Sequence, residues 1–282
     1  MKVAIIGAGP AGLLAAWGAT RYISLASVTI YDPDPTYRPE RILPLQYLHD
    51  TCGLKPDALK PLTIDYEITG IDPNLKDQVG LQKAAKFQYN AKLNRPLSEE
   101  NSTRYAFQDR PDIYSLRTAY TWLHGFFAER MVTLALTWDQ IVNDLPNDYD
   151  RVISTAPLPK LLPDWSWPTI DMWITPDYLP VEVRDGLCIL NVDPKVGWTR
   201  ATSLDGGKAT EWCKIAGEIF EFNIGHVLPY ALSLRKIVPP PKLPELPDKV
   251  YLAGRWGSWD AGILTHHAYY RARNIMDGPL LK

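Results

Sequence analysis

The sequence opens with a pattern that few folds accommodate: three glycines at G-x-G-x-x-G spacing directly after an apolar run. The run, Val3 to Ile6, contains β-branched residues and is long enough for a buried strand of a parallel sheet. Gly7, Gly9 and Gly12 follow it, and an apolar segment with helical character extends from residue 13 to about residue 22. The order strand, tight turn, helix predicts the first half of a βαβ unit.

Each glycine has a physical purpose at this spacing. Gly7 permits the tight turn out of the strand, Gly9 lets the backbone approach a pyrophosphate closely, and Gly12 lets the helix pack near the strand. The free N–H groups and positive dipole end of the helix then face the phosphates. A second strand over 27–31 ends at Asp32, which is placed to accept hydrogen bonds from an adenosine ribose. The stretch predicts a dinucleotide site; the alternative is a glycine-rich turn in an ordinary α/β protein.

Composition narrows the class of protein without identifying it. The 282 residues allow one large domain or two interleaved domains, and a hydrophobic content of 46% is ordinary for a globular protein. A net charge of −2 argues against a global basic field that would recruit duplex nucleic acid or an anionic membrane, although a local basic groove stays open. The three cysteines are widely spaced, form no metal-binding pattern and indicate reduced thiols, so we predict no metal site.

The chain starts on an expected strand rather than on a signal peptide, and it contains no run of eighteen apolar residues. We therefore expect a cytoplasmic protein without a membrane span. The 25 prolines predict long irregular connections. The 10 Trp and 15 Tyr residues suit a core or an interface, and they also suit a pocket that stacks planar rings.

In the middle of the chain, the sequence predicts a second sheet, and it also predicts more helices and strands of the parallel sheet. Residues 63–71 and 83–93 alternate like half-buried antiparallel strands, whereas 113–130 shows helical periodicity and 131–136 is expected to be a strand. The stretch 148–157 leaves an acidic turn as a strand and ends in small residues before a proline. Small residues there would let a cofactor pass over the carboxyl end of the strand.

Further features lie towards the C-terminus. Segment 168–200 is rich in strand formers, and Arg200 alternates so that it could project into a cleft, where its planar fork suits a carboxylate or a phosphate. A salt bridge at the rim is the alternative for that arginine. Residues 211–222 stay ambiguous between helix and strand. A buried strand over 249–254 then leads through a glycine-rich turn into a helix expected over 263–276.

These motifs together resemble a known family. Gly7 to Gly12 with Asp32, the run 152–157 and the run 250–255 resemble the glutathione-reductase-like FAD fold, and within it the amine oxidase and UDP-galactopyranose mutase branch. Residues 254–259, Gly-Arg-Trp-Gly-Ser-Trp, resemble a Gly-Arg-Phe-Gly-Ser-Trp motif of mutase-like proteins. Residues 198–200, Trp-Thr-Arg, resemble the Tyr-Thr-Arg segment that contributes a substrate-side arginine there.

The resemblance implies one FAD held by both ends of the chain. The adenosine half would be bound by the residues of the opening motif: Gly7, Gly9, Pro10, Ala11, Gly12 and Asp32. In such flavoproteins a basic or glycine-rich stretch after the second strand runs past the phosphates, which implicates Arg38 and Arg41; solvated surface arginines are the alternative. The backbone of Val132 would lie against the adenine.

The flavin half would be met by later residues: Ala156, Gly254, Arg255, Trp259, Gly262 and Ile263. The resemblance places Gly262 and Ile263 at the start of the last helix. The positive dipole end of that helix would favour an anionic reduced flavin.

Two candidate catalytic residues on the substrate side are His49 and Arg200, with His266 and Trp259 as secondary candidates. His49 lies among aromatic and apolar residues, where it is either a satisfied core histidine or a proton donor or polar contact at the flavin ring. Adjacent histidines point about 100° apart on a helix, so at most one of His266 and His267 would face the flavin. Either could instead be structural.

The expected architecture is α/β, with a Rossmann-like FAD-binding domain over 1–45, 113–165 and 240–282. A smaller antiparallel-sheet substrate domain is expected over 46–112 and 166–239. The expected function is that of an FAD-dependent oxidoreductase of the amine-oxidase-like type, with hydride transfer from a small substrate to the flavin. The alternatives are a non-redox flavin mutase or lyase acting on a nucleotide sugar, a nucleotide or a nucleic-acid base, and a non-catalytic dinucleotide-binding module. The substrate, electron acceptor, oligomeric state and covalent attachment of FAD stay open.

Overall fold

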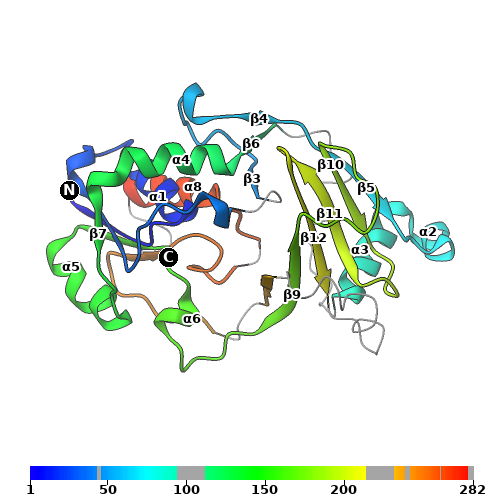
Figure 1. Cartoon of the computed structure of the whole chain (residues 1–282). Helices are drawn as coiled ribbons and strands as arrows, with labels where there is room; N and C mark the ends of the chain where they lie inside the picture. Colours follow the sequence, from blue (N-terminus) through cyan, green and yellow to red (C-terminus); the bar gives the residue numbers. More distant parts are fainter. Residues whose placement is uncertain (43–45, 94–111, 214–231, 239–241, 261, 279–282) are drawn as a thin grey trace.

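The structure is a computed structural model that describes residues 1–42, 46–93, 112–213, 232–238, 242–260 and 262–278. The described strands form a five-stranded sheet, a six-stranded sheet and a small three-stranded sheet. Helices gather around the first of these, and further helices lie beside the six-stranded sheet (Figure 1). The predicted α/β class with a parallel sheet is therefore confirmed.

The five-stranded sheet is parallel throughout and has the order β14-β8-β1-β2-β7. Its strands are Val250–Leu252, Arg151–Ser154, Val3–Ile6, Val28–Asp32 and Met131–Thr133. The chain adds β2 and β7 on one side of β1 and then returns to add β8 and β14 on the other side. Such a reversal makes the carboxyl ends of β1 and β8 a topological switch point, where open α/β sheets bind their ligands.

Alternate side chains of β1 serve two cores, as a strand buried on both faces requires. Val3 and Ile5 pack into the cluster that contains the residues of α1, α4 and α8, whereas Ala4 and Ile6 pack with Ile141 on the other face. The four helices beside this sheet are α1 (Pro10–Ala19), α4 (Leu116–Phe127), α8 (His267–Asp277) and the short α5 (Leu145–Asp148). The sheet is thus covered on both sides, and a further short helix, α6 (Leu158–Leu161), follows β8.

The six-stranded sheet has the order β13-β9-β12-β11-β10-β5. In that order its strands are Leu232–Ile237, Thr169–Pro176, Gly207–Cys213, Trp198–Leu204, Leu187–Asn191 and Asp65–Thr69. All neighbours pair antiparallel except β10 and β5, which are parallel. Of the ambiguous stretch 211–222, residues 211–213 belong to β12 and the others lie outside the described residues.

The expectation of a strand over 83–93 is wrong, because these residues form helix α3 (Leu81–Lys92). A shorter helix, α2 (Pro73–Val79), precedes it, and Gly80 separates the two with a φ of +81°. The buried residues of α3 include Ala84, Ala85 and Tyr89, which recur at helical spacing. Tyr89 packs in one cluster with side chains of the six-stranded sheet, so α3 covers part of that sheet.

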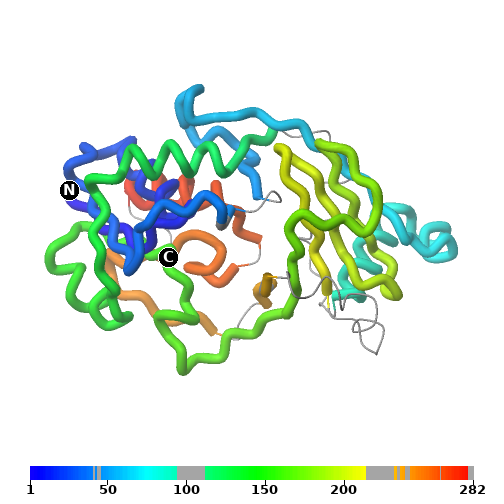
Figure 2. Tube along the Cα trace, viewed as in Figure 1, coloured from blue at the N-terminus to red at the C-terminus, as the bar shows by residue number. Residues whose placement is uncertain are grey.

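The small sheet links the two larger ones. It consists of β3 (Tyr47–Leu48), β6 (Ile113–Ser115) and β4 (Pro61–Leu62), in the order β3-β6-β4. Figure 2 shows how the chain passes repeatedly between the parallel sheet and the six-stranded sheet. The strands of the parallel sheet fall within 1–45, 113–165 and 240–282. The domain boundaries themselves stay a prediction.

Three features bear on the class of protein. In the described part of the chain, no helix is long and apolar enough to cross a bilayer. Within the same residues no group of three or more His, Cys, Asp or Glu side chains is arranged to hold a metal ion. Cys52, Cys188 and Cys213 are buried and free of disulfides.

Candidate functional site

The glycine loop folds so closely that two of its glycines are required by the protein itself. Gly7 has a φ of +106°, and its N–H donates to the carbonyl oxygen of Tyr31 at 2.8 Å. A Cβ on Gly12 would lie 1.8 Å from the carbonyl oxygen of Gly7. The tight turn and the close approach of helix to strand therefore both depend on glycine, as the spacing predicts.

Gly9 differs from its neighbours because nothing in the described part of the protein requires a glycine there. Its φ of −71° suits any residue, and a Cβ added to it would meet no atom within 4 Å. Gly9 is exposed and is the N-cap of α1, and no side chain caps this helix end. No acidic residue lies in the first turn to offset the helix dipole. An uncapped helix end beside an open glycine fits an anionic ligand such as a pyrophosphate.

Three segments distant in sequence meet at this point. Thr155, just beyond β8, donates both its N–H (2.8 Å) and its hydroxyl (2.9 Å) to the carbonyl oxygen of Ile6 at the end of β1. Beyond β14, Gly254 has a φ of +73°, and a Cβ there would lie 2.9 Å from the Cβ of Ala11. A Cβ on Gly257 would lie 2.9 Å from the Cα of Thr155. Small residues thus let the ends of β1, β8 and β14 converge at the switch point.

Asp32 ends β2 beside the glycine loop and holds two backbone N–H groups. Its Oδ2 accepts the N–H of Ala8 at 2.7 Å, and its Oδ1 accepts the N–H of Asp34 at 2.8 Å. The carboxylate is only partly buried, and its two oxygens offer about four lone-pair sites, so it keeps acceptor capacity for a ribose. Asp32 therefore orders the loop whether or not a ligand is bound.

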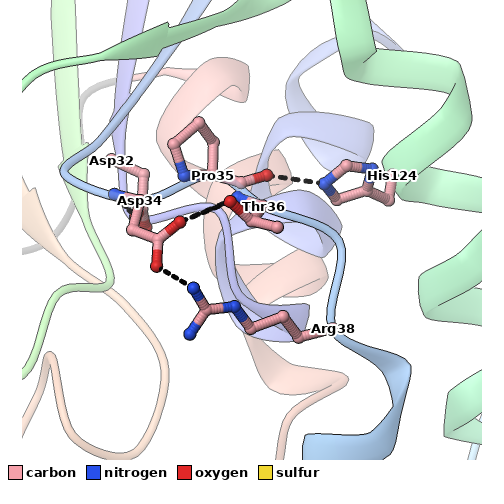
Figure 3. A network of polar contacts seen from close by, with 6 residues as sticks. All are labelled: Asp32, Asp34, Pro35, Thr36, Arg38 and His124. Atoms are coloured by element: carbon pink, nitrogen blue, oxygen red, sulfur yellow. Dashed lines mark hydrogen bonds and ion pairs between the residues drawn. The ribbon is translucent and has the colours of Figure 1, made fainter.

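The loop after β2 is braced against α4, as Figure 3 shows. The carbonyl oxygen of Pro35 lies 2.8 Å from Nε2 of His124. Asp34 accepts the hydroxyl of Thr36 at 2.5 Å and pairs with Arg38, whose Nη2 lies 2.5 Å from its Oδ2. Arg38, a predicted phosphate contact, thus has a carboxylate partner inside its own loop.

Two other residues predicted on the adenosine half have different positions. The side chain of Arg41 lies outside the described part of the structure, although its backbone ends a short 3-10 turn. Val132 lies in the edge strand β7, opposite Tyr31, with 41% of its surface exposed. A backbone contact of Val132 with an adenine stays a prediction.

The C-terminal turn differs from its expected form. The last helix begins at His267, four residues after Ile263, so the expected helix start at Gly262 and Ile263 is wrong. Those residues belong to a loop in which the N–H of Gly262 donates to Asp260 at 2.8 Å and Nε of Arg255 donates to the carbonyl oxygen of Ile263 at 3.0 Å. The dipole end of α8 therefore lies at His266 and His267.

Trp259 lies in the core, and its expected place beside the ligand stays a prediction. It is 2% exposed, and its indole N–H donates to the carbonyl oxygen of Val238 at 2.9 Å. Its ring centroid lies 4.8 Å from that of Trp167 and 5.5 Å from that of Trp256. The aromatic residues of the motif at 254–259 thus stabilise the turn by packing beneath it.

Two of the predicted catalytic residues come together at the start of α8. The rings of His49 and His266 are 5.8 Å apart, and the ring of Tyr47 lies 5.0 Å from that of His49. Burial, together with the smaller effect of the neighbouring His267, lowers the pKa of each histidine to about 4. Both imidazoles are therefore uncharged at neutral pH. A base with so low a pKa is a weak proton acceptor, so hydrogen bonding suits them better than proton transfer.

Arg200 is separate from these histidines but connected to them through tyrosines. It is paired with Glu211 across β11 and β12, and this contact is an ion pair inside the sheet rather than at its rim. The hydroxyl groups of Tyr47 and Tyr66 are in contact, and both tyrosines interact electrostatically with Arg200. A line of polar side chains therefore runs from the start of α8 to the middle of the six-stranded sheet.

Sequence reasoning missed several residues of this arrangement. Thr155 lies in the run of small residues before a proline, so the sequence indicates that it follows a strand end, but it does not indicate the two hydrogen bonds that Thr155 donates. Tyr47 and Tyr66 had no distinguishing pattern, since their contact joins two strands of different sheets. Lys236, which lies 3.4 Å from Glu211 and so shares its carboxylate with Arg200, had no signal at all.

No protein-family model matches this sequence, and no curated protein matches it either. Among solved structures it is similar to MibH, a tryptophan 5-halogenase, with a TM-score of 0.59 and 12% identity over 99% of this chain and 68% of that one. A geranylgeranyl bacteriochlorophyll reductase-like protein from Thermoplasma acidophilum has a TM-score of 0.58 and 12% identity, covering 98% and 76% of the two chains. HpxO from Klebsiella pneumoniae, in complex with FAD and uric acid, has a TM-score of 0.53 and 12% identity, covering 99% and 80%. At these identities the likeness establishes the fold.

Proposed function

We propose that this protein binds one FAD at the glycine loop and acts as an FAD-dependent oxidoreductase. The observation that carries the proposal is the open position at Gly9, where the helix end is uncapped and the ends of three parallel strands converge. HpxO, which has a similar fold, was solved with FAD bound. A glycine that the protein does not need for its own packing is best explained by a ligand that approaches it.

The N–H groups of Gly9 and Ala11, at the start of α1, would face the pyrophosphate, and Pro10 between them would contribute its fixed φ but no donor. Asp32 would accept hydrogen bonds from the adenosine ribose. Ala156, Gly254 and Arg255 would continue the site along the cofactor, with the loop at Gly262 and Ile263 beyond them. Arg38, Arg41 and Val132 stay weaker candidates on the adenosine side.

The substrate would lie beside the start of α8, between the parallel sheet and the six-stranded sheet. The flavin, when bound, supplies the acceptor for a hydride. His49 and His266 would hold the substrate by hydrogen bonds while they stay uncharged, and their burial would keep water away from the reacting atoms. Arg200 would bind a polar group of the substrate further along the sheet.

Hydride transfer from a small substrate, of the amine-oxidase-like type, is our first candidate reaction. Hydride transfer does not require a strong base in the site, so it is compatible with a pair of uncharged histidines. A mutase or lyase, in which the flavin must be reduced beforehand, is the alternative. The named similar structures carry other activities, so the fold does not select between the two.

The proposal is tested first by titrating the purified protein with FAD and following flavin absorbance and tryptophan fluorescence. We expect a yellow protein with saturable binding of one FAD per chain. Stopped-flow mixing with amines, nicotinamides and nucleotide sugars then separates the reactions. Bleaching of the flavin by a substrate supports an oxidoreductase, whereas turnover that begins only after dithionite reduction supports a mutase or lyase. A colourless protein that takes up no FAD contradicts the proposal.

A further inference from the structure

The six-stranded sheet carries two cations and one carboxylate in a single buried group. Arg200 on β11, Glu211 on β12 and Lys236 on β13 contribute them, and Glu211 is 4% exposed. Glu211 is in contact with Arg200, and its Oε2 lies 3.4 Å from Nζ of Lys236. Burial opposes ionisation of Glu211, but the two cations outweigh it and lower its pKa to about 2. The carboxylate is therefore charged at neutral pH.

The charges of this group do not balance among the described residues. One carboxylate faces two cations, which leaves a single surplus positive charge. Burying a charge without a partner costs several kcal/mol even after the protein relaxes, so such a surplus is normally offset by another anion. Tyr89 accepts a hydrogen bond from Nζ of Lys236 at 2.9 Å, but a neutral hydroxyl does not cancel a charge.

The two cations of this group also have a hydrogen-bond donor and exposed side-chain surface that a ligand could contact. Among the described residues, the buried Nε of Arg200 has no hydrogen-bond partner. The side chain of Arg200 is 23% exposed and that of Lys236 is 17% exposed, against 5% for Glu211. The two cations are thus reachable, while their internal carboxylate is covered.

We propose that Arg200 and Lys236 bind a carboxylate group of the substrate, with Glu211 as the fixed counter-ion that holds the guanidinium in place. Since the group lies on the substrate side of the site, the inference rests on the function proposed above. One surplus positive charge matches a monoanion. A phosphate, with a charge of about −1.5 to −2 at neutral pH, would leave an excess of negative charge. The nearby rings of Tyr47, Tyr66 and Tyr89 favour a carboxylate on a planar or apolar body.

The test compares benzoate with benzamide, which share a shape and differ in charge. Binding is measured by calorimetry on the protein with and without FAD, and by the change in flavin absorbance when FAD is present. We expect benzoate to bind at least about tenfold more tightly than benzamide, the effect of one charge-assisted contact. Inorganic phosphate should bind more weakly than benzoate.

Variants separate this site from general effects. Lys236→Met leaves the pair of Arg200 and Glu211 intact but removes the surplus charge, so benzoate should lose about tenfold in affinity with benzamide and FAD binding unchanged. Lys60→Met is the matched control, since Lys60 also pairs with a carboxylate, Asp205, but is 57% exposed.

Each contrary outcome has one meaning. Equal affinity for benzoate and benzamide overturns the proposed carboxylate site. Absence of benzoate binding, with a lower unfolding temperature for Lys236→Met, also overturns it, because a carboxylate of the chain itself would then balance the charge. Failure to bind FAD contradicts the proposed function instead, and calorimetry on the FAD-free protein still decides the question of the anion.

Discussion

The Cβ atom that Gly12 lacks would lie 1.8 Å from the carbonyl oxygen of Gly7, whereas one on Gly9 would meet nothing within 4 Å. The two positions of the same motif therefore need glycine for different reasons. At position 12, the packing of the helix against the turn leaves no room for a Cβ. At position 9, the described part of the protein leaves that room open, and we expect a ligand to approach there.

Gly12→Ala and Gly9→Ala should therefore affect different properties. Gly12→Ala forces the helix and the turn apart and should destabilise the fold by about 3 kcal/mol or more. Gly9→Ala should change the free energy of unfolding by less than about 1 kcal/mol, the usual range for Gly and Ala at an N-cap. It should weaken FAD binding by at least about tenfold, because the methyl group occupies the approach to the pyrophosphate.

Thermal unfolding and FAD titration measure the two effects. Gly125→Ala is the control, because Gly125 lies on α4 and its added Cβ would also meet nothing within 4 Å. If Gly9→Ala bound FAD as tightly as Gly125→Ala, the open position would have no role in cofactor binding.

Asp32→Asn should weaken FAD binding by about tenfold to a hundredfold, because a charged acceptor of ribose hydroxyls becomes neutral. The amide oxygen can still accept the N–H of Ala8, but the amide nitrogen cannot accept the N–H of Asp34, so the loop should also lose some stability. Asp34→Asn, which weakens the exposed contacts of Asp34 with Thr36 and Arg38, serves as the comparison. Equal FAD affinity in the two variants would remove Asp32 from the ribose site.

Trp259→Phe should lower stability without changing FAD affinity. The substitution deletes the hydrogen bond to the carbonyl oxygen of Val238 and leaves a small cavity, which together cost about 1–3 kcal/mol. Urea unfolding gives the first quantity and FAD titration the second. A large loss of FAD affinity with an unchanged unfolding midpoint would show that the indole contacts the cofactor after all.

Acid should destabilise the protein in two stages. The pKa values of His49 and His266 fall from 6.5 to about 4 on folding, so between these values the unfolded chain binds more protons than the folded one. Stability is then full above pH 6.5 and decreases as the pH falls towards 4. Glu211, whose pKa falls from 4.5 to about 2, adds a further loss below pH 4.5.

His266→Gln removes one of the two histidines and should reduce the loss of stability between pH 6.5 and 4 by about half. Urea midpoints measured across that interval provide the readout. Identical slopes for the variant and the wild type would mean that His266 is not titrated between these pH values.

The sequence predicted local events better than partnerships between distant strands. The turn at Gly7, the approach at Gly12 and the small residues around Thr155 are dictated by steric contacts within a few residues of a strand end, and their signals are local. By contrast, β10 pairs parallel with β5 across more than a hundred residues, and no local pattern encodes that choice.

Two predictions are wrong for different reasons. The residues of α3 alternate in polarity and so favour a strand, although Ala84, Ala85 and Tyr89 lie on one buried face of a helix. The resemblance places the start of the last helix at Gly262 and Ile263, whereas α8 begins at His267. The group of Arg200, Glu211 and Lys236 comes from three strands that the fold brings together, so no local pattern indicates it.

The convergence of Gly7, Thr155 and Gly254 has a consequence for biosynthesis. The first of these residues leaves the ribosome long before the last, so the early strands fold without a neighbour at the β14 position. Until β14 and α8 have been translated and docked, the loop lacks its C-terminal wall, and α1 lacks the helix against which Gly18 packs. Under the proposed function, FAD would therefore bind only late in synthesis, and by mass action it would stabilise the molecules whose fold is complete.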